Sequence, residues 1–230
     1  MFEKLKEEVL EANKDLVRLG LVTLTWGNVS GISRADRRVV IKPSGVEYES
    51  MTLEDMVVLD MEGRVIYGRL RPSSDTPAHL ELYRAFPAIG SIVHMHSQYA
   101  TMFAQACREI PCLGTTHADY FNGPVPLTRF VTPEEVAKGY EQATATVIIE
   151  RFARLDPLAT PGVIVAGHAP FVWGKNCAHA IRNGFILEKI AELALGTLQL
   201  NPGASPLPAH IQNKHYQRKH GPDAYYGQKR

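Results

Sequence analysis

The chain has 230 residues, of which 45% are hydrophobic and 21% are charged. These are the values of an ordinary globular domain, and they exclude disorder, collagen and coiled coil as its main character. Lysine and arginine number 25 against 24 acidic residues. The chain therefore lacks the basic surplus with which proteins neutralise nucleic-acid phosphates. The length predicts one domain over residues 1–230.

Membrane and secretion patterns are missing from the sequence. No run of about 20 apolar residues could span a bilayer, and residues 1–11 lack the apolar core of a secretory signal. Cys107, Cys112 and Cys177 form no C-x-x-C pair, which favours reduced packing residues. We therefore expect a cytoplasmic protein that binds neither membranes nor nucleic acids.

The first third of the chain predicts one helix followed by strands. Apolar residues from Leu5 to Leu19 recur at steps of three and four, which predicts a helix that Gly20 ends. Alternation over Val22–Trp26 predicts a strand that Gly27 breaks. Further short strands are expected at Val39–Ile41, Met56–Leu59 and Val65–Tyr67.

The rest of the chain interleaves helices and strands. Thr76 looks like a cap before a helix with Pro77 at its first position. Thr132 and Glu135 form a capping box, which predicts one helix to about Arg154. A long helix should begin at Asn176. Strands are expected at Ile92–His96 and Val163–Val165. Interleaving of this kind predicts an α/β domain whose sheet is not purely parallel.

Three histidines stand at or near strand ends. On a strand, His94 and His96 would point to the same face, about 7 Å apart at their roots. They are either metal ligands or hydrogen-bonded histidines. His168 follows another apolar strand, and three histidines with an open position are typical of a catalytic zinc site. Asp75 is either a fourth ligand, a residue that orients one, or a helix N-terminal charge.

Two polar loops and one amide suggest an anion site. One loop carries Lys42, Ser44 and Gly45, and the other places Ser73 and Ser74 just before a helix. Turns and helix N-termini offer free N–H groups to anions. Asn28 adds an amide to this set. Taken singly these residues are ordinary turns or caps, whereas together they predict a phosphate site if the fold joins them.

The C-terminal segment, 202–230, combines basic and aromatic residues. It contains His215, Arg218, Lys219 and Tyr226. A basic tail is usually a solvated end. The aromatic side chains favour docking onto another surface, such as a second subunit.

Several motifs taken together resemble one known family. They are Leu24–Ser30, Ile41–Val46, Pro72–Pro77 and Gly114–Tyr120, with the tail motifs Lys214–Tyr216 and Tyr225–Gln228. These segments closely resemble the L-ribulose-5-phosphate 4-epimerase family of the class II aldolase/adducin-head superfamily. The resemblance runs nearly end to end.

The resemblance implies a fold and an assembly. The fold would be a single α/β domain with a central mixed, largely antiparallel sheet covered by helices on both sides. The chain would form a cyclic homotetramer whose active sites lie at subunit interfaces, with the tail docking there. The substrate would be a phosphorylated ketopentose, and the pathway could be arabinose catabolism, another pentose route or an ascorbate route.

The resemblance also assigns roles to residues of this chain. A divalent metal, most simply Zn²⁺, would be bound by Asp75, His94, His96 and His168. The substrate phosphate would be bound by Asn28, Lys42, Ser44, Gly45, Ser73 and Ser74. Acid–base catalysis would fall to Asp119 and to Tyr226 of a neighbouring subunit, with His215 near the same site. Glu141 would lie close to that interface.

The activity implied is retro-aldol cleavage and re-addition, which inverts carbon 4 of L-ribulose 5-phosphate to give D-xylulose 5-phosphate. An aldolase or dehydratase of the same superfamily is an alternative, although its aldolases carry Glu where this chain has Asp75. A non-catalytic adducin-head-like module is another, and it would have lost the metal ligands. Ala169 stands where the family is expected to have Gly.

Overall fold

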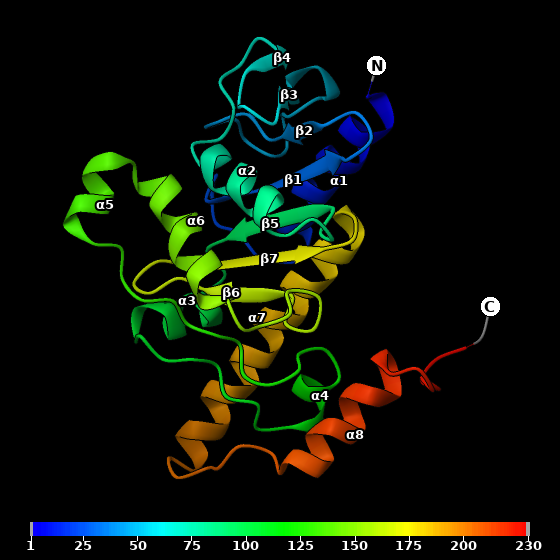
Figure 1. Ribbon diagram of the computed structural model, residues 1–230, viewed down its shortest axis with the longest axis vertical. Coiled ribbons are helices and arrows are strands. Elements are labelled where there is room, and N and C mark those ends of the chain that lie inside the picture. Colours follow the sequence, from blue (N-terminus) through cyan, green and yellow to red (C-terminus); the bar gives the residue numbers. More distant parts are fainter. Residues whose placement is uncertain (1, 229–230) are drawn as a thin grey trace.

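The computed structural model describes residues 2–228. One seven-stranded sheet has the order β4-β3-β2-β1-β5-β7-β6, and each neighbouring pair in it is antiparallel (Figure 1). A parallel bridge joins Leu127, which lies outside these strands, to Ile164. The prediction of an α/β fold with a largely antiparallel sheet is confirmed. The strands are β1 (Gly27–Ser33), β2 (Arg38–Ile41), β3 (Val57–Asp60), β4 (Val65–Tyr67), β5 (Ser91–Met95), β6 (Gly162–Ile164) and β7 (Pro170–Gly174).

Helices cover both faces of this sheet, as predicted. One core joins the sheet to α1 (Glu3–Arg18), α3 (Gln98–Gln105) and α7 (Cys177–Leu200). The second core joins it to α2 (Thr76–Ala85) and α6 (Tyr140–Arg151). Because each central strand is buried on both faces, even its polar residues must find partners inside the protein.

Four short or peripheral helices complete the described chain. Within the second half, α4 (Thr115–Ala118) lies beside α8 (Ala209–His220), well below the sheet in Figure 1. The others are η1 (Leu53–Asp55) and α5 (Pro133–Lys138). None of the helices described for residues 2–228 combines the length and apolar character needed to cross a bilayer.

The predicted strand over Val22–Trp26 is wrong. This segment is a turn in which Leu24 has a φ of 51° and both Leu24 and Trp26 are more than half exposed. The strand begins instead at Gly27, where we expected a break. Its residues Asn28 and Ser30 are buried and polar, so β1 has no apolar alternation to recognise.

Three further expectations need correction. The single helix predicted from Thr132 to Arg154 is two helices, because Gly139 adopts a φ of 146° between α5 and α6. Neither β7 nor α8 was predicted, and α8 has no buried residue. The cap of α2 is Asp75 rather than Thr76. The Thr132 capping box and the Asn176 cap of α7 are both confirmed.

Candidate metal and phosphate site

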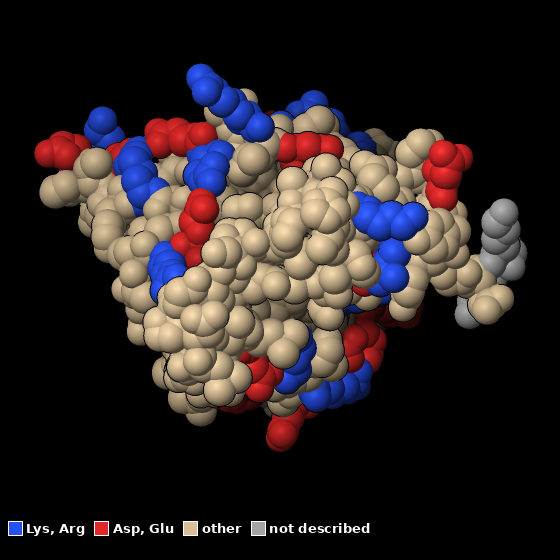
Figure 2. All heavy atoms as spheres, turned by 90° about the horizontal axis from the view of Figure 1, so that it is seen from below, with Lys and Arg blue, Asp and Glu red and all other residues tan. Residues whose placement is uncertain are grey.

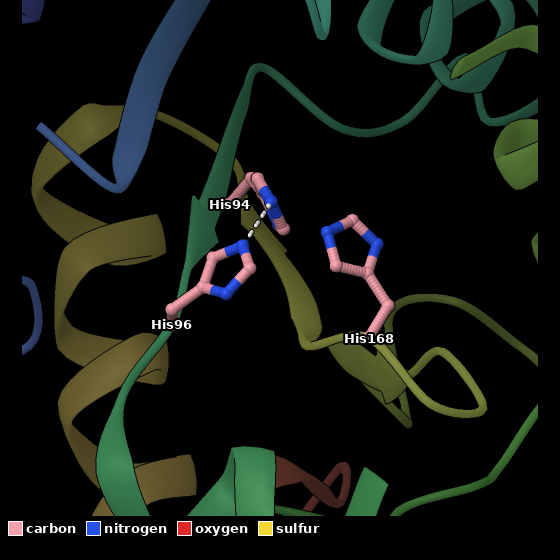
Figure 3. A group of neighbouring side chains, drawn as sticks. All are labelled: His94, His96 and His168. Carbon is pink, nitrogen blue, oxygen red and sulfur yellow. Dashed lines mark hydrogen bonds between the residues drawn. The ribbon is translucent and has the colours of Figure 1, made fainter. Parts of the chain in front are cut away.

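His94, His96 and His168 converge at one edge of the sheet (Figure 3). His94 lies on β5, His96 follows the end of that strand, and His168 lies in the turn between β6 and β7. One ring nitrogen from each lies within 4.8 Å of the other two, and Nε2 of His96 is 3.2 Å from Nε2 of His94. Their ring centroids are 4.9–5.0 Å apart.

His94 is fixed by its surroundings. Its Nδ1–H donates to the carbonyl oxygen of Pro170 at 3.0 Å, which leaves Nε2 unprotonated with its lone pair toward Nε2 of His96. Its ring also stacks on Phe171, with the centroids 4.2 Å apart. Burial lowers the pKa of His94 and of His96, and it lowers that of His168 to about 4. All three are therefore neutral at pH 7, the form in which imidazole binds a metal.

The three histidines fit a divalent metal. Each of the three rings presents one nitrogen to the space between them (Figure 3). Three imidazole nitrogens facing one space are the donor set of zinc and related ions. These residues would therefore hold such an ion between them.

Asp75 lies beside the cluster at the N-terminus of α2. Its Oδ2 accepts a hydrogen bond from Nδ2 of Asn28 at 2.6 Å. Burial alone would raise the pKa of Asp75, but nearby His94 and His79, together with the Asn28 hydrogen bond, hold it below its usual value. Asp75 is thus an anion next to the histidines, although its ligation of a metal stays a prediction.

The fold joins the two polar loops. The backbone N–H of Ser44 donates to the carbonyl of Arg71, and that of Ser73 donates to the carbonyl of Lys42. A bridge between Pro43 and Pro72 lies between these contacts. The hydroxyl-bearing loops therefore run side by side, which is the condition for treating them as one phosphate site.

Lys42 places a cation beside these loops. It is 2% exposed, and its ammonium group donates to the carbonyls of Val46 at 2.6 Å and Pro43 at 3.2 Å. Burial lowers its pKa. None of the ion pairs within residues 2–228 involves Lys42. A buried cation without a carboxylate is suited to receive a phosphate.

One cavity of about 620 Å³ contains both groups of residues. Its lining includes every residue predicted for the metal and the phosphate, namely Asn28, Lys42, Ser44, Gly45, Ser73, Ser74, Asp75, His94, His96 and His168. Trp26 and Tyr140, for which no role was predicted, also line it, as does Glu141, which was expected close to a subunit interface. Trp26 packs edge-on to His96, with the ring centroids 6.5 Å apart. Only the resemblance of the segment that contains Trp26 could have drawn attention to it.

The predicted acid–base residues do not line this cavity. Asp119 directly follows α4 and contacts α8 of the same chain. Its Oδ1 accepts from Nε of Arg218 at 2.8 Å and from Nδ1 of His215 at 3.1 Å. Burial alone would raise the pKa of Asp119, but Arg218 and His215 hold it below its usual value. Tyr226 is 59% exposed and packs against Lys219 and Arg218.

Ala169 is accommodated without displacing a ligand. It is fully buried, and its carbonyl accepts the backbone N–H of Val165 across the turn that carries His168. The methyl group therefore fits in the turn, and the neighbouring His168 still faces His94 and His96.

Comparisons with known proteins place the chain in a family. Residues 7–195 match the family described as Class II Aldolase and Adducin N-terminal domain. The chain therefore belongs to the class II aldolase and adducin family.

Within that family, curated relatives match the chain almost end to end. A protein of Salmonella paratyphi A named L-ribulose-5-phosphate 4-epimerase UlaF is 54% identical over 227 residues, which are 99% of this chain and 100% of that protein. A protein of the same name from Salmonella paratyphi C is 53% identical over the same shares of both chains.

Solved structures share the fold. An L-fuculose 1-phosphate aldolase superposes with a TM-score of 0.79 at 24% identity, covering 94% of this chain and 95% of that one. The L-fuculose-1-phosphate aldolase of Thermus thermophilus gives a TM-score of 0.65 at 24% identity, covering 89% and 98%. At this identity the likeness establishes the architecture alone.

Proposed function

We propose that this chain interconverts L-ribulose 5-phosphate and D-xylulose 5-phosphate by cleaving and re-forming the bond between carbons 3 and 4. The observation that carries the proposal is a single cavity lined by three neutral imidazoles, a buried lysine and two hydroxyl-bearing loops. The names of the relatives that are 53–54% identical support the same reaction.

The chemistry explains why an epimerase of this substrate resembles an aldolase. The carbonyl at carbon 2 acidifies only the hydrogens on carbons 1 and 3, so carbon 4 cannot be inverted by simple deprotonation. When the carbon 4 hydroxyl loses its proton, the carbon 3–carbon 4 bond breaks and its electron pair passes to carbon 3. The products are an enediolate and glycolaldehyde phosphate. Re-addition to the opposite face of the aldehyde, followed by protonation of the carbon 4 oxygen, completes the inversion.

The cavity supplies two of the requirements of this reaction. His94, His96 and His168, with Asp75 beside them, would hold a divalent metal, which we propose is zinc. When bound, the metal supplies Lewis-acid stabilisation of the negative charge on the substrate oxygens.

Lys42 and the loops at Ser44 and Ser73 would bind the phosphate. Because they retain the aldehyde fragment while it turns over, recombination stays effectively unimolecular.

Asp119 and Tyr226 would supply proton transfer on the two faces of carbon 4. Within one chain they do not line the cavity, so we propose that a neighbouring subunit brings these groups to it. A cyclic homotetramer in which segment 202–230 docks at the interface satisfies this requirement. Residues 229–230 of that segment lie outside the described residues.

The surface beside α8 is suited to such docking. Figure 2 shows the lower end of the molecule, where charged side chains lie mainly towards the rim and uncharged residues occupy a broad central area. Leu193 and Leu200 of α7 are 57% and 91% exposed.

We also propose a cytoplasmic location, for which the three free cysteines are typical.

Incubation with L-ribulose 5-phosphate tests the proposal. The expected result is formation of D-xylulose 5-phosphate to an equilibrium mixture, inhibition by a chelator, and recovery on addition of Zn²⁺. Free glycolaldehyde phosphate and dihydroxyacetone in stoichiometric yield would instead identify an aldolase. No turnover and no metal binding would favour the non-catalytic module.

A further inference from the structure

A fully buried histidine lies behind the cavity and takes no part in the proposed chemistry. His79 is on α2 and is 0% exposed. Its Nδ1 is 2.7 Å from Oγ of Ser30, which is 2.8 Å from Oη of Tyr83. If the tyrosine donates to the serine and the serine to Nδ1, then Nε2 of His79 carries the ring proton. That Nε2 has no hydrogen-bond partner among the described residues.

Two more acceptors with spare capacity belong to residues next to it. Oδ1 of Asn28 is buried and also lacks a partner within residues 2–228. The side-chain hydrogen bonds that the Asp75 carboxylate accepts from Asn28 and Ser73 reach Oδ2, which leaves Oδ1 for another donor. His79 thus has a buried donor and Asn28 a buried acceptor without partners among the described residues, whereas full pairing is the rule for buried groups. Oδ1 of the half-buried Asp75 is a further acceptor that receives no side-chain hydrogen bond within residues 2–228.

The secondary structure places these residues together. Asn28 and Ser30 are two apart on β1 and so share one face, while Asp75, His79 and Tyr83 are spaced by four on α2 and so share one side. The two elements are joined by successive contacts, Asn28 to Asp75 and Ser30 to His79. The Asp75 carboxylate and the His79 ring, which are one helical turn apart, are thus both hydrogen-bonded to β1.

His79 also backs one of the three clustered histidines. Its ring lies edge-on to Phe171, with centroids 5.9 Å apart, and Phe171 stacks on His94 at 4.2 Å. In the sheet, His94 lies between Asn28 on β1 and Phe171 on β7. Displacing the His79 ring would therefore loosen Phe171, one of the two sheet neighbours of His94.

We propose that His79 is a positioning residue for the metal centre. Its Nε2–H would donate to an ordered water that also contacts Oδ1 of Asp75 and Oδ1 of Asn28, since a buried water takes two to four such partners. This link would hold the Asp75 carboxylate in the orientation that a metal requires. The inference rests on the proposed function, because it assumes that the three histidines and Asp75 bind a divalent ion.

Two amide substitutions separate the roles of the two ring nitrogens. In His79→Asn the amide lies near the Nδ1 position and keeps the contact to Ser30. In His79→Gln it reaches the Nε2 position instead. Matched controls are His117→Asn and His117→Gln, because His117 is also buried, its Nε2 donates to the carbonyl of Gly123, and it does not line the cavity.

The test is titration of chelator-stripped full-length protein with Zn²⁺ and Co²⁺, the latter followed by its visible absorption, alongside thermal unfolding of each apo variant. We expect His79→Asn to raise the Kd about 10- to 100-fold and alter the Co²⁺ spectrum. His79→Gln should stay within about threefold of the wild type. Both His117 variants should bind metal normally, and His117→Asn, which loses the contact to Gly123, should unfold at lower temperature.

Two results would overturn the inference: a His79→Asn protein that binds metal like the wild type, or equal weakening in the Asn and Gln variants. Failure of the proposed function looks different. In that case the wild-type protein binds no divalent ion, or His96→Ala binds it as tightly as the wild type.

Discussion

The charged groups of the cavity and those of the α4–α8 contact differ in how far they are paired within the chain. In the cavity, the hydrogen bonds of the Lys42 ammonium group go to carbonyls, and the group also lies over the ring of Tyr48 without a carboxylate in an ion pair with it among the described residues. At the α4–α8 contact, Asp119 is surrounded by Arg218, His215 and Lys219. The cavity therefore leaves a charged group without an ion-pair partner for a ligand to contact, whereas Asp119 is already paired with residues of its own chain.

This difference indicates that the cavity of one chain can bind a ligand, whereas proton transfer by Asp119 requires a further change. Groups buried without partners carry a desolvation cost that a ligand can relieve. A carboxylate paired to arginine stays ionised and is a weak base. The cavity is therefore ready to bind within one chain, whereas Asp119 gains a catalytic role only if the tail contacts rearrange or face a neighbouring cavity.

The largest expected effect follows from removing one imidazole. His96→Ala should reduce epimerisation on the order of 1,000-fold, since Lewis-acid stabilisation contributes several kcal/mol. Metal content after dialysis and the rate of D-xylulose 5-phosphate formation check this. The matched control is exposed His210→Ala, which should retain both. Normal turnover by His96→Ala would remove the histidine cluster from the reaction.

A smaller loss is expected for the tail. Tyr226→Phe should slow epimerisation about 100- to 10,000-fold, the range for one general acid–base group, with metal content unchanged. Steady-state rates and metal analysis separate the two effects. Tyr225→Phe, at a neighbouring exposed tyrosine, should be nearly normal. Full activity in Tyr226→Phe would show that the tail does not take part in proton transfer.

The phosphate loops should affect binding more than turnover. Lys42→Met keeps the aliphatic stem and removes the charge, so KM should rise about 10- to 100-fold, as expected for a hydrogen bond to a charged group. Inhibition by inorganic phosphate should weaken in parallel. Lys189→Met is the control, because Lys189 is exposed and pairs with Glu192. An unchanged KM in Lys42→Met would place the phosphate elsewhere.

The smallest effect concerns stability in acid. Burial lowers the pKa of His117 to about 4, so between about pH 6.5 and 4 the unfolded chain binds the extra proton. The free energy of unfolding should therefore fall as the pH drops through this window, by up to about 1.4 kcal/mol per pH unit for one histidine. Urea unfolding at several pH values checks this, and His117→Asn should flatten the slope. An unchanged slope in that variant would contradict the assignment.

Sequence reasoning predicted the elements that carry a regular apolar pattern. It succeeded for α1 and α7 and for the helical layers on both faces of the sheet. It failed at β1 because Asn28 and Ser30 are buried polar residues whose partners come from α2. It missed α8 because that helix buries no residue, and its contact with Asp119 is visible only in three dimensions.

Site prediction followed the same division. Chemistry and motif resemblance pointed to His94, His96, His168 and the two polar loops, and the fold places all of them in one cavity. Trp26 and Tyr140 were missed because their exposure depends on turn and helix geometry that no local pattern records. The sequence alone predicts no role for His79, since its unpaired nitrogen becomes evident only once α2 packs on β1.

The most direct test of the central claim is a crystal structure of the zinc-loaded protein with anomalous diffraction measured at the zinc edge. We predict one strong anomalous peak in the cavity, within bonding distance of a ring nitrogen from each of His94, His96 and His168. A peak at any other place, or three imidazoles pointing away from one another with no peak between them, would contradict the account.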